Sequence, residues 1–125
     1  MAQPEKELVM QVAQYLQMQY PNVIYRFDLA ADMKLTVGQA ARNKRLHCHR
    51  GYPDLFIAEP RGGFNGLFIE LKAVPIYKRD GSLKTSEHLR EQQAYHDTLV
   101  IKGYAACFAV GFDEAKDIID KYMKL

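Results

Sequence analysis

The chain has 125 residues, of which 48% are hydrophobic and 26% are charged, close to the averages of globular domains. We expect one domain with a single core. No apolar run reaches the roughly 20 residues of a membrane helix, and the N-terminus does not resemble a secretory signal. The two cysteines are far apart, which favours free thiols in a cytoplasmic protein with no membrane association. The formal net charge of +2 identifies no partner by itself.

The N-terminal part of the chain predicts one helix and one strand. Apolar residues recur at helical spacing over residues 4–20, and Pro21 ends this helix because the residue before a proline is disfavoured in helical geometry. Residues 23–29 are rich in β-branched and aromatic side chains, which is typical of a strand.

Residues 30–52 have no clear periodicity and are interpreted as a surface loop. Between positions 34 and 50 this loop has no acidic residue but five basic ones, which are Lys34, Arg42, Lys44, Arg45 and Arg50. A solvated loop explains such a run, and a surface that faces a polyanion explains it equally well. The His47–His49 segment lacks the paired ligand spacing of a structural zinc site, so its histidines are assigned to the same basic loop.

The remaining residues predict a hairpin followed by helix, strand and helix. The hairpin strands cover 54–58 and 66–73 around the Gly62–Gly63 pair. After a polar loop over 74–85 we expect a helix over 86–102, a strand over 104–111 and a last helix through 124, capped by Asp113. The order helix–strand–strand–strand–helix–strand–helix favours the α/β class, with a mixed β-sheet flanked by helices.

Glu70 and Lys72 are unexpected inside the apolar strand LFIELK, where they share one face. If the hairpin folds about Gly62, the midpoint between positions 54 and 70, Asp54 lies opposite Glu70. Two opposed carboxylates are destabilising unless a cation lies between them, and Mg²⁺ is typically held by one or two carboxylates. A divalent metal is therefore one interpretation of the pair. A half-exposed salt bridge between Glu70 and Lys72 is the other.

These residues also form a known pattern. Pro53-Asp54, followed after fifteen residues by Glu70-Leu71-Lys72, resembles the PD-(D/E)xK motif of the restriction-endonuclease-like nucleases. The flanking segments GYPDLFIAEP, GLFIELKA and SEHLREQQAYHDTLVIKGY are similar to the VRR-NUC (virus-type replication-repair nuclease) family. The resemblance extends over residues 5–120. It implies a restriction-endonuclease-like core and one nuclease domain over 1–125, of the stand-alone phage or bacterial type.

The resemblance also implies roles for individual residues. Asp54 and Glu70 would hold Mg²⁺ or Mn²⁺, with the main-chain carbonyl of Leu71 as a further ligand, and Lys72 would assist the attacking water. A glutamate of the first helix commonly completes such sites, and we choose Glu7 over Glu5 for this position.

Gln92 matches the glutamine that the family carries on the helix after the motif, although the neighbouring Gln93 leaves the register open. The structural alternatives are that Glu7 only complements the helix dipole and that Gln92 is an exposed surface residue.

The sequence thus predicts a metal-dependent, structure-selective DNA endonuclease. The resemblance to Holliday-junction resolvases implies branched DNA as the substrate and a homodimer as the active form. Phosphate contacts are assigned to the basic residues of the 34–50 segment and to those of the second loop, Lys78, Arg79 and Lys84. The alternatives are a flap, single-strand or restriction-like nuclease, a non-catalytic DNA-binding module with the same fold, and a structural protein.

Overall fold

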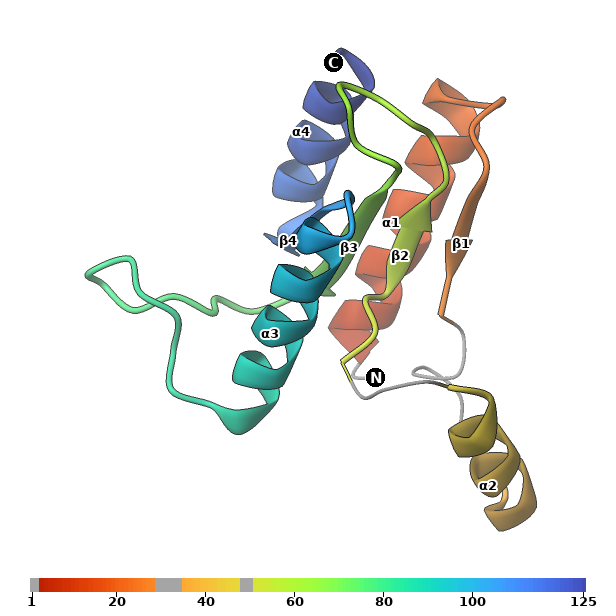
Figure 1. The fold of residues 1–125 in the computed structure, drawn as a ribbon, viewed down its shortest axis with the longest axis vertical. Coiled ribbons are helices and arrows are strands. Elements are labelled where there is room, and N and C mark those ends of the chain that lie inside the picture. Colours follow the sequence, from red (N-terminus) through yellow and green to blue (C-terminus); the bar gives the residue numbers. More distant parts are fainter. Residues whose placement is uncertain (1–2, 29–34, 48–50) are drawn as a thin grey trace.

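The computed structural model describes residues 3–28, 35–47 and 51–125 (Figure 1). Its elements, in chain order, are α1 (Gln3–Gln19), β1 (Tyr25–Phe27), α2 (Val37–Leu46), β2 (Leu55–Ile57), β3 (Leu67–Lys72), α3 (Glu87–Ile101), β4 (Ala105–Val110) and α4 (Gly111–Met123). The strands form one sheet in the order β1-β2-β3-β4, antiparallel except for the parallel pair β3–β4, which α3 connects. The predicted α/β class with a mixed sheet flanked by helices is confirmed.

The sheet has an apolar face and a mixed face because successive side chains of a strand alternate. The apolar face packs against α1 and α4, and its fully buried strand residues are Leu55, Ile57, Leu67, Ile69, Leu71 and Ala109. The mixed face bears Phe56, Phe68 and Glu70, and α3 lies over its β3–β4 half (Figure 1). There Leu89 of α3 packs with Phe108 of β4 in a smaller second cluster.

The β2–β3 hairpin has the register that the sequence predicts. Leu55 pairs with Ile69, so the next position along the ladder places Asp54 opposite Glu70. The turn itself is Gly62–Gly63, where φ values of 58° and 87° lie in the region that favours glycine.

The turn is not symmetric about this ladder. A bridge between Arg61 and Phe64 closes the turn. Between this bridge and the last pair of the ladder, the β2 side has three residues, 58–60, and the β3 side has two, 65–66. The Tyr122 hydroxyl donates a hydrogen bond to the carbonyl oxygen of Glu59 at 2.6 Å. The β2-side segment that contains the extra residue is thus hydrogen-bonded to α4. The extra residue shifts the pairing of β2 with β3 by one position.

Helix α2 is the main difference from the predicted elements, since it lies where the sequence analysis expected a loop. It begins with a capping box: the Thr36 hydroxyl accepts from the Gln39 amide at 3.2 Å, and Gln39 Oε1 accepts from the Thr36 amide at 3.0 Å. None of its residues is buried. The helix has no apolar stripe because it does not pack on the core, and only the Thr-x-x-Gln spacing indicates it in the sequence.

Two smaller predictions concern helix ends. Ser86 caps α3 as expected, and its hydroxyl accepts from the amide of Leu89 at 3.4 Å. The prediction that Asp113 caps the last helix is wrong, because α4 already begins at Gly111, directly after β4 and without a side-chain cap. Within the described ranges, no helix combines the length and the apolar character that crossing a bilayer requires.

Candidate active site

Two carboxylates from neighbouring strands meet on the mixed face of the sheet. Asp54 is 7% exposed and Glu70 is 6% exposed. Asp54 stands just before β2, and its Oδ2 accepts a hydrogen bond from the backbone amide of Leu71 at 2.9 Å. Oε1 of Glu70 is buried and has no hydrogen-bond partner among the described residues. The hairpin register therefore brings two acids together and leaves one of their oxygens unsatisfied.

The electrostatics of this pair favour a cation. Burial raises the pKa of Asp54, the Leu71 amide opposes that shift, and the charge of Glu5 adds to it. Burial also raises the pKa of Glu70 far above its ordinary value, and the negative charge of Asp54 raises it further. The ammonium group of Lys72 lies 3.9 Å from Glu70 Oε2 and compensates the pair only in part. Burial and mutual repulsion therefore oppose the doubly ionised state of the pair, and added positive charge would favour it.

The donor set fits a hard divalent metal ion. Two carboxylates and the Leu71 carbonyl are the oxygen ligands that Mg²⁺ and Mn²⁺ prefer, and the unsatisfied Glu70 Oε1 is available for coordination. In the described part of the chain, no group of three or more His, Cys, Asp or Glu side chains surrounds one point. The protein would therefore supply few side-chain ligands and leave positions for water and for a phosphate oxygen.

A row of side chains on α3 faces Glu70. Gln92 is 3% exposed, and its Nε2 donates to Glu70 Oε2 at 2.9 Å, whereas Gln93 is exposed and bonds Asp97. The register that the sequence left open thus places Gln92 in the site. One turn earlier, Nε2 of the exposed His88 lies 3.2 Å from the same Gln92 nitrogen. His88 was not predicted from the sequence, although its i, i+4 spacing to Gln92 places both on one helix face.

One turn later in the same row lies His96, which is 1% exposed. Its ring packs against Phe108 at a centroid distance of 4.6 Å, and neither ring nitrogen has a hydrogen-bond partner among the described residues. Burial lowers the pKa of His96 to about 4, and the charge of Lys72 acts in the same direction. His96 is therefore neutral near pH 7. It was not predicted as a site residue from the sequence.

The structure favours Glu5 over Glu7 as the helix glutamate of the site. Glu5 is half-buried on the side of α1 that also carries Leu8 and Val12, and its charge raises the pKa of Asp54. Glu7 is exposed, because two residues correspond to about 200° around a helix. The exposure of Glu7 speaks against its choice from the sequence, and the part that either glutamate plays in metal binding stays a prediction.

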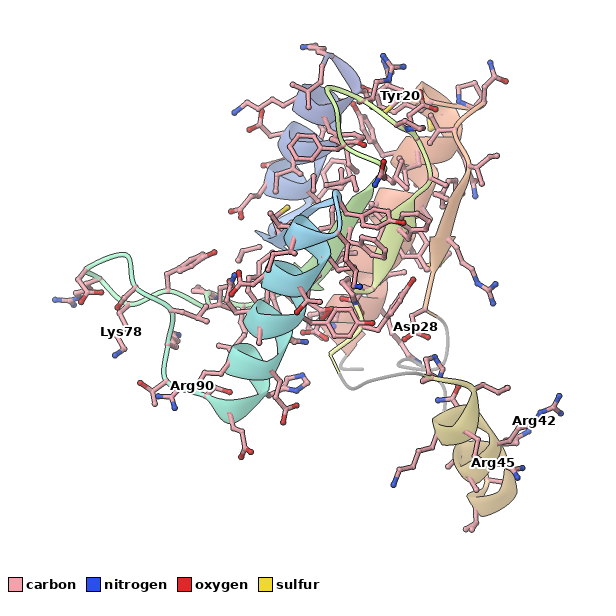
Figure 2. The ribbon with its side chains drawn as sticks, viewed as in Figure 1. Tyr20, Asp28, Arg42, Arg45, Lys78 and Arg90 are labelled. Atoms are coloured by element: carbon pink, nitrogen blue, oxygen red, sulfur yellow. The ribbon has the colours of Figure 1, made fainter. Side chains whose placement is uncertain are left out.

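The basic residues lie outside this centre. Arg42, Lys44 and Arg45 are exposed on α2, and Lys78, Arg79 and Lys84 are exposed on the loop between β3 and α3. Figure 2 shows that α2 and this loop project on opposite sides of the body. Lys34 and Arg50, like Cys48 and His49, lie outside the described residues. Contact of these basic residues with DNA stays a prediction.

Comparisons with known proteins agree with this architecture. No family model matches the chain, and no curated protein matches it. Among solved structures, a VRR_NUC domain protein is similar with a TM-score of 0.65 and 27% sequence identity, over 100% of this chain and 92% of that chain. The likeness therefore includes every element that builds the site. The chain has the VRR-NUC fold, a nuclease-type fold, as its motifs predicted.

Proposed function

We propose that the protein is a metal-dependent, structure-selective endonuclease that hydrolyses phosphodiester bonds in branched DNA, as a Holliday-junction resolvase does. One observation carries the proposal: Asp54 and Glu70 are buried opposite each other, beside Lys72, on a nuclease-type fold. A binding module has no use for two opposed buried acids, because they would repel a DNA phosphate unless a metal ion lay between them.

In this reaction Asp54, Glu70 and the carbonyl of Leu71 would hold Mg²⁺ or Mn²⁺. When bound, such an ion polarises the scissile phosphate and lowers the pKa of water. The Leu71 amide orients Asp54, and Gln92 orients Glu70, so both acids are fixed before the substrate arrives. Lys72 is placed to neutralise the charge that develops on the phosphate oxygens or to orient the attacking water.

The surface supports DNA as the substrate. The exposed cations of α2 and of the loop over 74–85 lie on opposite sides of the body and would contact phosphates, which adds affinity without base specificity. We therefore assign selectivity to the shape of the DNA. Symmetric cleavage of a junction requires two active sites, which a two-fold homodimer would provide.

The test is a cleavage assay on four-way junction, flap, splayed-arm and plain duplex DNA with Mg²⁺, Mn²⁺ or EDTA. We expect metal-dependent paired nicks in the junction with the wild-type protein and none with Asp54→Asn. Asp113→Asn, the same change at an exposed position of α4, is the matched control and should cut normally. Cleavage of flaps alone would keep the site and change the substrate. DNA that is bound but never cut would replace the proposal with a binding module.

A further inference from the structure

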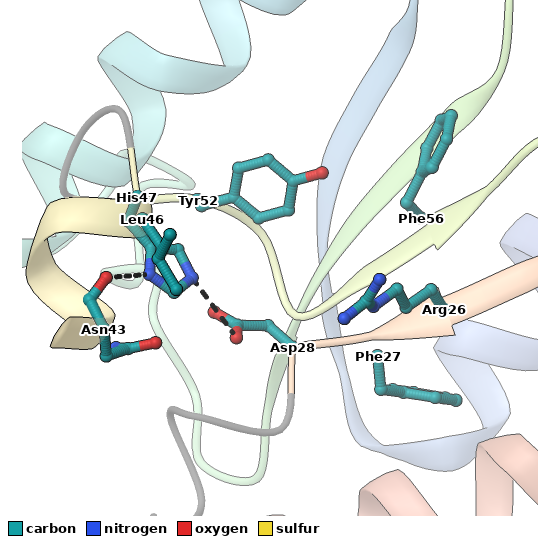
Figure 3. A pocket seen from close by; sticks show the side chains of 8 residues that line it. All are labelled: Arg26, Phe27, Asp28, Asn43, Leu46, His47, Tyr52 and Phe56. Atoms are coloured by element: carbon teal, nitrogen blue, oxygen red, sulfur yellow. Dashed lines mark hydrogen bonds and ion pairs between the residues drawn. The ribbon is translucent and has the colours of Figure 1, made fainter. Parts of the chain in front are cut away.

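A cavity of about 390 Å³ lies where β1, β2 and α2 meet, on the half of the sheet that α3 does not cover (Figure 3). Its lining comes from β1, α2, β2 and the segment before β2, and consists of Arg26, Phe27, Asp28, Asn43, Leu46, His47, Tyr52 and Phe56. The volume is within the range of sites for small molecules or single chemical groups, about 300–1,000 Å³. The hydrolytic mechanism described above uses none of these side chains.

The cavity adjoins the catalytic centre through the sheet. The backbone amide of Asp28 donates to the carbonyl oxygen of Asp54 at 2.8 Å, and the strand register places these two residues opposite each other. Asp28, Asp54 and Glu70 thus form one row across three neighbouring chain segments. Adjacent strands are about 4.8 Å apart, so the cavity begins one strand spacing from Asp54, on the side away from Glu70. That spacing is short enough for one nucleotide to reach from the centre into the cavity.

One wall of the cavity is aromatic. The Phe56 ring is held by stacking on Phe68 at 4.4 Å, and the Tyr52 ring meets Phe68 edge-on at 5.7 Å. Gly66 makes this arrangement possible, because a Cβ at that position would lie 2.8 Å from the Phe56 ring. Tyr52 keeps more than a third of its surface exposed. Aromatic side chains of this kind are the usual stacking surfaces for single-stranded bases.

The other walls carry both donors and acceptors. Arg26 stands beside Phe56 in the ladder and offers a guanidinium group, while Asp28 offers a carboxylate (Figure 3). The His47 ring lies 3.8 Å from the Asp28 carboxylate and 2.7 Å from the carbonyl oxygen of Asn43, which fixes this wall to α2. The Asp28 carboxylate in the lining would repel a phosphate group. A donor and an acceptor beside aromatic rings match the edge and the face of a nucleobase.

We propose that this cavity receives one unpaired base of the DNA strand, adjacent to the phosphate that is cleaved. The inference rests on the proposed nuclease function and refines its substrate: the nucleotide next to the cut is unpaired, as at a branch point or a single-stranded arm. A fully paired duplex is a poorer substrate because a base would first have to leave the stack.

The test is an abasic scan of the four-way junction used in the cleavage assay, in which each base near the branch point is removed in turn. Binding is measured for the wild-type protein with Ca²⁺ in place of Mg²⁺, so that affinity is separated from cleavage. We expect one abasic position, directly beside the cut, to weaken binding about 5- to 150-fold, the range for loss of one stacked base. Other positions should change affinity much less.

Two variants test whether the base at that position binds in the cavity. Arg26→Ala and Phe56→Leu should bind the intact DNA more weakly, and the sensitive abasic position should then cause little further loss. Arg61→Ala and Phe64→Leu, the same changes at the far end of the hairpin, are controls and should keep the wild-type profile. Thermal melting shows whether each variant is folded. If Phe56→Leu does not fold, the result for Arg26→Ala, a change at an exposed position, is used alone to test the proposal.

An abasic profile without a sensitive position, or one that Arg26→Ala leaves unchanged, would overturn the base-binding role. The nuclease proposal fails separately, if no DNA is cut with Mg²⁺ or Mn²⁺. A sensitive position in a protein that never cuts would support the cavity and reject the nuclease.

Discussion

The two faces of the sheet are made by alternate residues of the same strands, yet they bury different chemistry. The face against α1 and α4 buries only apolar side chains from the strands, with Ile69 completely enclosed. The face toward α3 buries Asp54, Glu70, Gln92 and His96, and the last three have side-chain atoms without hydrogen-bond partners in the described part of the molecule. Unsatisfied buried polar atoms are rare in stable cores and gather at functional sites. One face therefore stabilises the fold, and the other buries polar groups at a cost in stability, as expected for a functional site.

The strongest test of this difference between the two faces is a pair of substitutions at adjacent residues. Ile69→Ala should lower the free energy of unfolding by about 2–5 kcal/mol, because it leaves a cavity in the core, while the folded protein still cuts DNA. Glu70→Gln should abolish cleavage and change stability by less than about 1 kcal/mol, because it removes a carboxyl group that burial disfavours. Urea unfolding and single-turnover cleavage measure both. If Glu70→Gln unfolds the protein, the α3 face is structural.

Lys72 tests whether the mixed face acts on the reaction itself. Lys72→Ala should reduce the cleavage rate about 10²- to 10³-fold and leave metal affinity nearly unchanged, since its ammonium group would act on the phosphate or the water. Rate constants at saturating Mn²⁺ and a separate Mn²⁺ titration distinguish the two effects, with the exposed Lys121→Ala as the control. An equal loss of affinity and rate would mean that Lys72 only holds Glu70.

Two glutamates on α1 sharpen the limits of the site. Glu5→Gln should weaken Mn²⁺ binding about 10- to 100-fold, as expected if Glu5 supports Asp54 as a proposed metal ligand. Glu7→Gln is the matched control at an exposed position and should bind Mn²⁺ as the wild-type protein does. Calorimetric titration measures both without any cleavage. The opposite result would restore Glu7 to the site.

The smallest expected effect is a pH dependence from His96. Its pKa is about 4 in the folded protein and near 6.5 in the unfolded chain, so between these pH values the unfolded chain binds more protons. Stability therefore falls as the pH drops from 6.5 to 4, by an amount on the order of 2 kcal/mol. The charged groups around the ring are Asp97 on α3 and Lys72 on β3. His96→Leu should remove this contribution to the decrease of stability at acidic pH.

Urea unfolding at pH 7.5, 6 and 5 measures the free energy of unfolding of the wild type and of His96→Leu. In the difference between the two proteins, the contributions of the other histidines cancel. We also expect His96→Leu to be at least as stable as the wild type at pH 7.5, because it replaces two unsatisfied nitrogens by apolar surface. Parallel stability curves for the two proteins would show that His96 does not titrate differently on unfolding.

The sequence predicted those parts of the molecule whose side chains face a core. The strands of the hairpin were predicted from their apolar residues, and folding the hairpin about Gly62 placed Asp54 opposite Glu70. Helix α2 escaped prediction because it buries nothing, and Glu7 was preferred because its relation to Asp54 depends on how α1 packs on the sheet. The cavity could not be predicted from the sequence because it also depends on how distant segments pack. Its walls come from three separate segments, represented by Arg26, Asn43 and Tyr52, and no spacing in the chain links them.

The extra residue between Ile57 and Arg61 decides the phase of the two hairpin strands. If the ladder followed directly from the Arg61–Phe64 bridge, Asp54 would face Leu71, and the two acids would point to opposite sides of the sheet. The surface segment over 58–60 thus acts as a spacer for a centre that it never touches. Its length is constrained even where its side chains are not. Deleting one residue from it would disassemble the acid pair, whereas lengthening both strands by one residue each would preserve the pair.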